Sequence, residues 1–144
     1  MKQYYIFLAA ALILSACKQK TVKKEEVQET PTPDFVVAFG SCNMSQEPNL
    51  FWDDILAQQP DVWIWGGDIV YADTDDVERL KAIYAMQDTV SGYAALKKEV
   101  PIIGTWDDHD FGVNDGGAEF AIKAESQQVF LDFMDVPADS ERRN

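Results

Sequence analysis

From residue 35 onward, short runs of consecutive apolar residues alternate with longer segments in which apolar residues recur every three or four positions. Three of the runs, at 35–39, 62–65 and 100–105, have the length of strands and contain few polar residues. Continuous apolar strands separated by helices are typical of a largely parallel sheet that is buried on both faces. The pattern therefore predicts an α/β fold with the element order β-α-β-α-β-α.

The segments between and after these strands have the spacing of helices. Helices are predicted over 48–59, 75–98 and 118–134. In the first of them, Phe51 and Ile55 lie one turn apart, and Pro60 ends the helix. In the second, a break is expected near Ser91 and Gly92 because glycine favours the end of a helix.

The first 34 residues differ in composition from the rest. Residues 1–17 are mainly an apolar run after a positively charged start, too short for a membrane-spanning helix, which needs about 20 apolar residues. The run ends in Leu-Ser-Ala-Cys, which resembles a bacterial lipoprotein signal and implies cleavage before Cys17 and lipidation of its sulfur. An ordinary secretory signal is the alternative. Residues 18–34 are polar, as in a flexible tether, so we expect an exported cell-envelope lipoprotein whose folded domain covers 35–144.

The charge of the chain is strongly negative. It has 25 Asp and Glu against 12 Lys and Arg, a net charge of −13, and residues 34–144 alone have 22 acidic against 7 basic residues, a net charge of −15. Nucleic-acid binding requires clustered Lys and Arg, so no nucleic-acid surface is expected. One His and two Cys exclude a multi-histidine zinc site, a zinc finger and a disulfide scaffold.

Reactive side chains follow each of the three predicted strands. The strands end in 40–43, 67–71 and 105–110. These segments contain Cys42, the single His109 and several aspartates. Because the carboxyl ends of parallel strands meet at one edge of a sheet, we expect these side chains to converge.

A bound metal would explain so many carboxylates in one place. Four of them follow the strands: Asp68, Asp107, Asp108 and Asp110. Close together, they would repel one another unless a cation neutralised them. A thiolate from Cys42 and a phenolate from Tyr71 would suit a ferric ion, and the carboxylate oxygens would suit calcium or another hard divalent ion. The imidazole of His109 would remain for acid–base chemistry.

The three segments also form distinctive motifs. They are Phe-Gly-Ser-Cys-Asn at 39–43, Gly-Asp at 67–68 followed by Tyr71, and Thr-Trp-Asp-Asp-His-Asp-Phe-Gly at 105–112 followed by Asn114 and Asp115. Together they resemble the PhoD-like (alkaline phosphatase D) family of metallophosphoesterases, over about residues 35–136. The resemblance implies a calcineurin-like αββα sandwich in which two metal ions, Fe³⁺ and Ca²⁺, activate water to hydrolyse phosphate mono- or diesters.

The resemblance further implies roles for individual residues. Cys42 and Tyr71 would ligate the iron, and Asp68 would bridge the two ions. Asp108 would bind the second ion, and His109 would act as the general acid or stabilise the leaving oxygen. Supporting positions next to these ligands are expected at Asn43, Asp107, Asp110 and Asn114.

Each of these residues also has an ordinary structural interpretation. Cys42 alone would be a small buried side chain, and Asp68 a residue that ends a strand in a turn. Tyr71 would be an aromatic residue at the rim of a site. Three further aspartates would form the acidic, solvated start of a helix: Asp73, Asp75 and Asp76. Three tryptophans are expected to serve packing: Trp63, Trp65 and Trp106.

Members of the family continue well past the length of this chain, with further metal ligands and a second sheet. We therefore expect residues 35–144 to be the amino-terminal part of a longer domain, with an uncovered apolar sheet face and no compact ending after the last helix. A non-catalytic lipoprotein that keeps part of the metal-binding loops is the alternative function.

Overall fold

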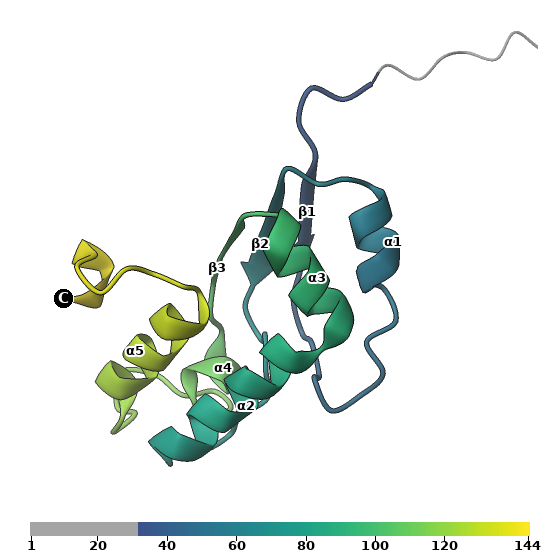
Figure 1. The fold of residues 1–144 in the computed structure, drawn as a ribbon. Coiled ribbons are helices and arrows are strands. Elements are labelled where there is room, and N and C mark those ends of the chain that lie inside the picture. The colour runs from purple at the N-terminus through teal and green to yellow at the C-terminus, as the bar shows by residue number, and fades with distance from the viewer. Residues whose placement is uncertain (1–31) are drawn as a thin grey trace, which may run out of the picture. The chain divides into compact units, whose positions relative to one another are not determined.

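Three short strands form a parallel sheet in the computed structural model, which describes residues 32–144. The strands are β1 (Val37–Gly40), β2 (Val62–Gly66) and β3 (Ile102–Thr105), side by side in that order (Figure 1). The predicted α/β class with a parallel sheet is confirmed. The predictions for 1–17, including Cys17, and for nearly all of 18–34 concern residues outside the described part of the chain. Within residues 32–144, no helix is long and apolar enough to span a membrane.

Two strands begin two residues later than predicted, for reasons that lie in the backbone. The N–H of Val36 donates to the Asp61 carboxylate over 2.7 Å instead of entering the ladder. Pro101 has no N–H to donate, although its carbonyl accepts from the N–H of Trp63 over 3.0 Å. Regular pairing therefore starts at Val37 and Ile102.

The three helical segments predicted at 48–59, 75–98 and 118–134 are present but shorter, and two further short helices were not predicted. The helices are α1 (Trp52–Ala57), α2 (Val77–Thr89), α3 (Ser91–Glu99), α4 (Asp108–Phe111), α5 (Lys123–Phe133) and the 3-10 helix η1 (Glu141–Arg143). The predicted break near Ser91 lies at Val90, which has an extended ψ of 112° between α2 and α3. The start of the first helix at residue 48 was wrong, because the Asn49 amide donates to the carbonyls of Met44 and Glu47 and holds a loop there.

One face of the sheet is covered by α1 and α3 through four buried aromatic side chains. Trp63 and Trp65 point to this face, where Trp52 of α1 and Tyr93 of α3 contact them with ring centroids 5.2–5.7 Å apart. Gly92 permits this contact, because a Cβ atom there would lie 2.4 Å from the Cβ of Trp52. The predicted packing role of these sheet tryptophans is confirmed.

The end of the described chain folds back on α5. Arg143 of η1 forms an ion pair with Asp132 over 2.9 Å and donates to the Gln128 amide oxygen over 3.1 Å. Arg143 also donates to the carbonyl of Pro137 over 3.0 Å. The expectation that the chain lacks a compact ending after the last helix was therefore wrong, because the Arg143 side chain anchors these residues to the helix.

The opposite face of the sheet remains apolar and uncovered by any described element. Phe39, Ile64 and Ile103 are paired neighbours on the three strands, and Phe39 is 78% and Ile103 51% exposed. Parallel sheets are normally covered on both faces. The expected open face is thus present in residues 32–144.

Candidate metal centre

The segments that follow the three strands meet at one edge of the sheet, as predicted. The loop after β1 is tied to the loop after β2 by backbone hydrogen bonds from Cys42 N–H to the Gly67 carbonyl, 3.3 Å, and from Asn43 N–H to the Asp68 carbonyl, 2.8 Å. Cys42 and Asp68 have φ values of 55° and 50°, in the left-handed region that non-glycine residues rarely occupy. Backbone strain of this kind concentrates at functional sites, so both positions are candidates for a site.

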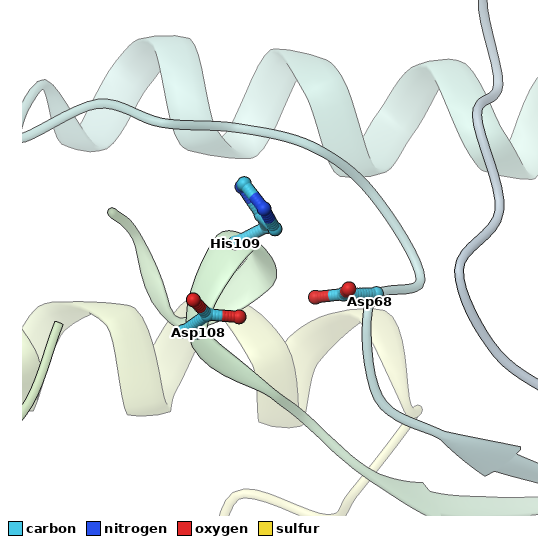
Figure 2. A group of neighbouring side chains, drawn as sticks. All are labelled: Asp68, Asp108 and His109. Atoms are coloured by element: carbon cyan, nitrogen blue, oxygen red, sulfur yellow. The ribbon is translucent and has the colours of Figure 1, made fainter. Parts of the chain in front are cut away.

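Asp68, Asp108 and His109 form a cluster whose ligand atoms all lie within 4.8 Å of one another. Figure 2 shows the carboxylates of Asp68 and Asp108 pointing toward one another, with the His109 ring beside them. Asp68 follows β2, whereas the other two residues begin α4 after β3. Asp68 and Asp108, which are 40 residues apart in sequence, thus contribute to one group of ligand atoms, and we call it the Asp–Asp–His cluster.

The carboxylate of Asp68 carries the strongest sign of a missing partner. The residue is only 8% exposed, and its Oδ1 atom is buried with no hydrogen-bond donor among the described residues. Its Oδ2 atom lies 3.8 Å from the Cys42 sulfur. A buried carboxylate oxygen normally has a donor or a cation. The residues around Asp68 therefore fit a metal ion.

Tyr71 lies beside Cys42, Asp68 and His109. Burial, together with the neighbouring Cys42 and Asp68, raises the pKa of its phenol to about 12. The Tyr71 ring also contacts the His109 ring, with centroids 4.4 Å apart. Without a cation Tyr71 is a neutral phenol, so it would become a ligand only if a metal displaced its proton.

Asp107 and Asp110 hold the short helix α4 in place. Asp107 is the N-cap and accepts from the N–H of Asp108 over 3.0 Å, while Asp110 accepts from the N–H of Asp107 over 2.7 Å, which completes a capping box. Asp110 is fully buried and also accepts from the N–H of Ile69 over 2.9 Å. Both residues thus orient the helix turn that carries Asp108 and His109.

The carboxylates on this turn differ in their electrostatics. Burial raises the pKa of Asp110 to about 6, although the N–H groups of Ile69 and Asp107 act in the opposite direction. A hydrogen bond from the backbone N–H of Asp115 lowers the pKa of Asp108. Asp108 is therefore ionised at neutral pH and is the better ligand for a cation.

His109 has a carboxylate partner that the sequence did not reveal. Its Nδ1 atom lies 2.7 Å from the Asp73 carboxylate, which also accepts from the N–H of Asn114 over 3.1 Å. Burial lowers the pKa of His109, but Asp73, Asp108 and Asp68 raise it, and the net effect is a pKa above the ordinary value. The sequence predicts Asp73 in the solvated start of a helix, but α2 begins after Asp76, which is its N-cap, and Asp73 pairs with His109 instead.

The two predicted asparagines contact other parts of the structure. The Asn43 amide donates to the Ile69 carbonyl and to the Gln87 side chain, over 3.0 and 2.7 Å, and so anchors the loop after β1 to α2. Asn114 donates to its neighbour Asp115 over 2.8 Å. None of these three side-chain hydrogen bonds involves the Asp–Asp–His cluster. The backbone N–H of Asn114, however, donates to the Asp73 carboxylate that pairs with His109, so Asn114 lies next to the cluster.

Gly67 explains how the segments after β2 and β3 come so close. Its φ of 96° suits glycine, and a Cβ atom there would lie 2.6 Å from the Cβ of Asp107. Any larger residue at this position would push Asp68 away from α4.

Comparisons with known proteins identify no relative of the chain. No protein-family model, curated protein or solved structure matches the chain.

Proposed function

We propose that this chain belongs to a metal-dependent phosphoric ester hydrolase of the PhoD-like type. The single observation that carries the proposal is the buried Oδ1 of Asp68, which has no donor among the described residues and lies within the Asp–Asp–His cluster. The motifs that hold Cys42, Asp68 and His109 support it, because the three of them lie together in the fold.

Five residues have the chemistry and the placement that the reaction requires. Asp68 and Asp108 would hold the ions, and Cys42 and Tyr71 would complete the iron site. The two ions, Fe³⁺ and Ca²⁺ by resemblance, would polarise the phosphoryl group and supply an activated water when bound. His109 would donate a proton to the leaving oxygen, since Asp73 occupies its Nδ1 atom and keeps the ring protonated to higher pH.

The architecture and the anchor belong to the same proposal. A calcineurin-like αββα sandwich would place a second sheet on the open face that carries Phe39 and Ile103. The Leu-Ser-Ala-Cys motif that ends at Cys17 would anchor the protein to a membrane of the bacterial envelope.

One alternative is favoured by the number of ligands. The described residues bring four candidate ligand side chains together beside His109, which are few for two closed metal sites: Cys42, Asp68, Tyr71 and Asp108. The alternative is a lipoprotein that binds metal through these loops without turnover.

The test combines metal binding with turnover by the full chain. Isothermal calorimetry should show that Ca²⁺ or iron binds, and that Asp68→Asn weakens binding at least about tenfold, because a carboxylate that would hold the ions is lost. The control is Asp139→Asn, which changes an exposed carboxylate outside the cluster. Hydrolysis of p-nitrophenyl phosphate or bis-p-nitrophenyl phosphate by the metal-loaded protein would support the enzyme. Metal binding without turnover of either ester would support the alternative, and no metal binding would exclude both.

A spectroscopic test addresses the iron ligands. A ferric ion bound to thiolate and phenolate should absorb visible light through charge transfer. Tyr71→Phe should remove the phenolate component of this absorption, whereas Tyr84→Phe, which changes a buried tyrosine that donates to the Asp110 carbonyl, should keep it. An unchanged spectrum in Tyr71→Phe would remove Tyr71 from the ligand set.

A further inference from the structure

A cavity of about 470 Å³ lies between the loop after β1 and α1. Its wall includes four aromatic side chains, Phe51, Trp52, Trp63 and Trp65. The three indoles are buried and contact one another edge to face, with centroids 5.2–5.7 Å apart. We call this space the aromatic cavity.

The wall of the aromatic cavity is suited to an apolar ligand. Among its lining residues, only Cys42 and Glu47 have ionisable side chains. Trp63 is buried, and its indole N–H has no acceptor among the described residues. Small-molecule sites combine aromatic walls with a few polar groups that orient the ligand, and a buried indole N–H usually has a partner. The Trp63 N–H has almost no accessible surface, so the aromatic wall, and not this N–H, would recognise the ligand.

The aromatic cavity adjoins the Asp–Asp–His cluster through Cys42. This residue lines the cavity, and its sulfur lies 3.8 Å from Oδ2 of Asp68. The two neighbours of Cys42, Ser41 and Asn43, line the cavity as well. A small molecule with one end at the cluster could therefore place its other end against the aromatic wall of the cavity.

We propose that the aromatic cavity binds the aryl group of a phosphate ester whose phosphoryl group lies at the Asp–Asp–His cluster. This inference rests on the proposed function and names its substrate class. An aryl group fits this wall, because Phe51, Ile55 and the indoles supply apolar and edge-to-face contacts. The volume is in the range that holds one or two aromatic rings.

The indole N–H groups provide a test that does not require turnover. The chain has four tryptophans, of which three line the aromatic cavity, while Trp106 lies outside it and contacts Phe111 and Phe130. In ¹H–¹⁵N spectra, phenyl phosphate should shift the indole signals of Trp52, Trp63 and Trp65. Methyl phosphate, which has no aryl group, should leave these three signals in place.

A pair of phenylalanine variants provides the matched kinetic test. Phe51 is 73% exposed and lines the aromatic cavity, whereas Phe35 is 61% exposed and does not line it. Phe51→Ala should raise KM for phenyl phosphate about two- to tenfold and leave KM for methyl phosphate unchanged. Phe35→Ala should change neither value.

The possible outcomes distinguish failure of the aryl-binding proposal from failure of the proposed function. Shifted cavity indoles with turnover support both, and shifted indoles without turnover support the cavity while the hydrolase assignment fails. Turnover of phenyl phosphate with unshifted cavity indoles overturns only the proposal that the aromatic cavity binds the aryl group. Equal shifts of all four indoles, or equal shifts with methyl phosphate, also overturn it.

Discussion

At the scale of single residues, similar aspartates in the same loops have different tasks. Asp108 lies in the Asp–Asp–His cluster, whereas Asp107 and Asp110 cap the helix turn that carries it. Asp73 pairs with His109, and Asp76, three residues later, caps α2. These assignments depend on the direction of each side chain. A run of aspartates in a sequence does not reveal that direction.

The ion pair between Asp73 and His109 leads to a prediction about the leaving group. Under the proposed function, Asp73→Asn should lower kcat about ten- to a hundredfold for methyl phosphate, because His109, the proposed general acid, would lose its orienting carboxylate. For p-nitrophenyl phosphate, whose leaving group needs little protonation, kcat should change much less. KM should stay nearly constant in both cases. The control Asp75→Asn changes an exposed aspartate nearby.

A structural readout accompanies these kinetics. His109 is the only histidine of the chain, so its ring ¹⁵N signals can be assigned directly. Asp73→Asn should change its tautomer or ring environment, whereas Asp75→Asn should not. Equal losses of kcat for both esters, with unchanged ring signals, would contradict a positioning role for Asp73.

Asp110 makes the stability of the metal-free protein depend on pH. Its pKa of about 6 in the folded state lies above that of an unfolded chain, so the folded state holds this proton more tightly. The stabilisation is complete below about pH 4 and is lost as the pH rises through about 6. In Asp110→Asn, which loses one acceptor, the stability deficit relative to the native chain should therefore shrink from pH 4 to pH 7.

Urea unfolding at several pH values measures this difference in free energy. The exposed Asp54 provides the control, since Asp54→Asn should leave the pH dependence unchanged. A constant difference between the native chain and Asp110→Asn across this range would contradict the raised pKa of Asp110.

At the scale of elements, the strands were predictable and the helix starts were not. The parallel strands are continuous apolar runs, and β2 matches its prediction to within one residue. The starts of α1 and α5 depend on local hydrogen bonds, such as that of Asn49 with the carbonyl of Met44. The turn of α4 was missed because four residues are too few to show a helical period.

The contact between α1 and α3 leads to a prediction about Gly92. At an exposed position of a helix, a glycine-to-alanine substitution raises the free energy of unfolding by up to about 1 kcal/mol. At Gly92 the added Cβ would clash with Trp52, so Gly92→Ala should instead lower the free energy of unfolding by about 1–3 kcal/mol. Chemical denaturation measures the change, and Ser91→Ala, at an exposed neighbouring position, is the control. A stabilised Gly92→Ala variant would contradict this close contact.

At the scale of the whole molecule, the net charge of −15 on residues 34–144 opposes compaction. Raising NaCl from about 10 to about 200 mM should screen this repulsion and raise Tm by about 2–5 °C. Ca²⁺ at matched ionic strength should raise Tm further in the native chain but not in Asp68→Asn, because only a bound ion neutralises the cluster. Equal effects of Ca²⁺ and NaCl on the native chain would show that calcium merely screens charge.

The sequence by itself determined the α/β class, the parallel order of the strands and the edge at which Cys42, Asp68 and His109 meet. It could do so because alternating apolar strands and helices allow few arrangements, and the carboxyl ends of parallel strands share one edge. Only the tertiary structure decided that Asp73 pairs with His109 and that three tryptophans line a cavity beside Cys42. Those features depend on side-chain directions and left-handed backbone positions, which follow from packing between distant segments and leave no periodic pattern in the chain.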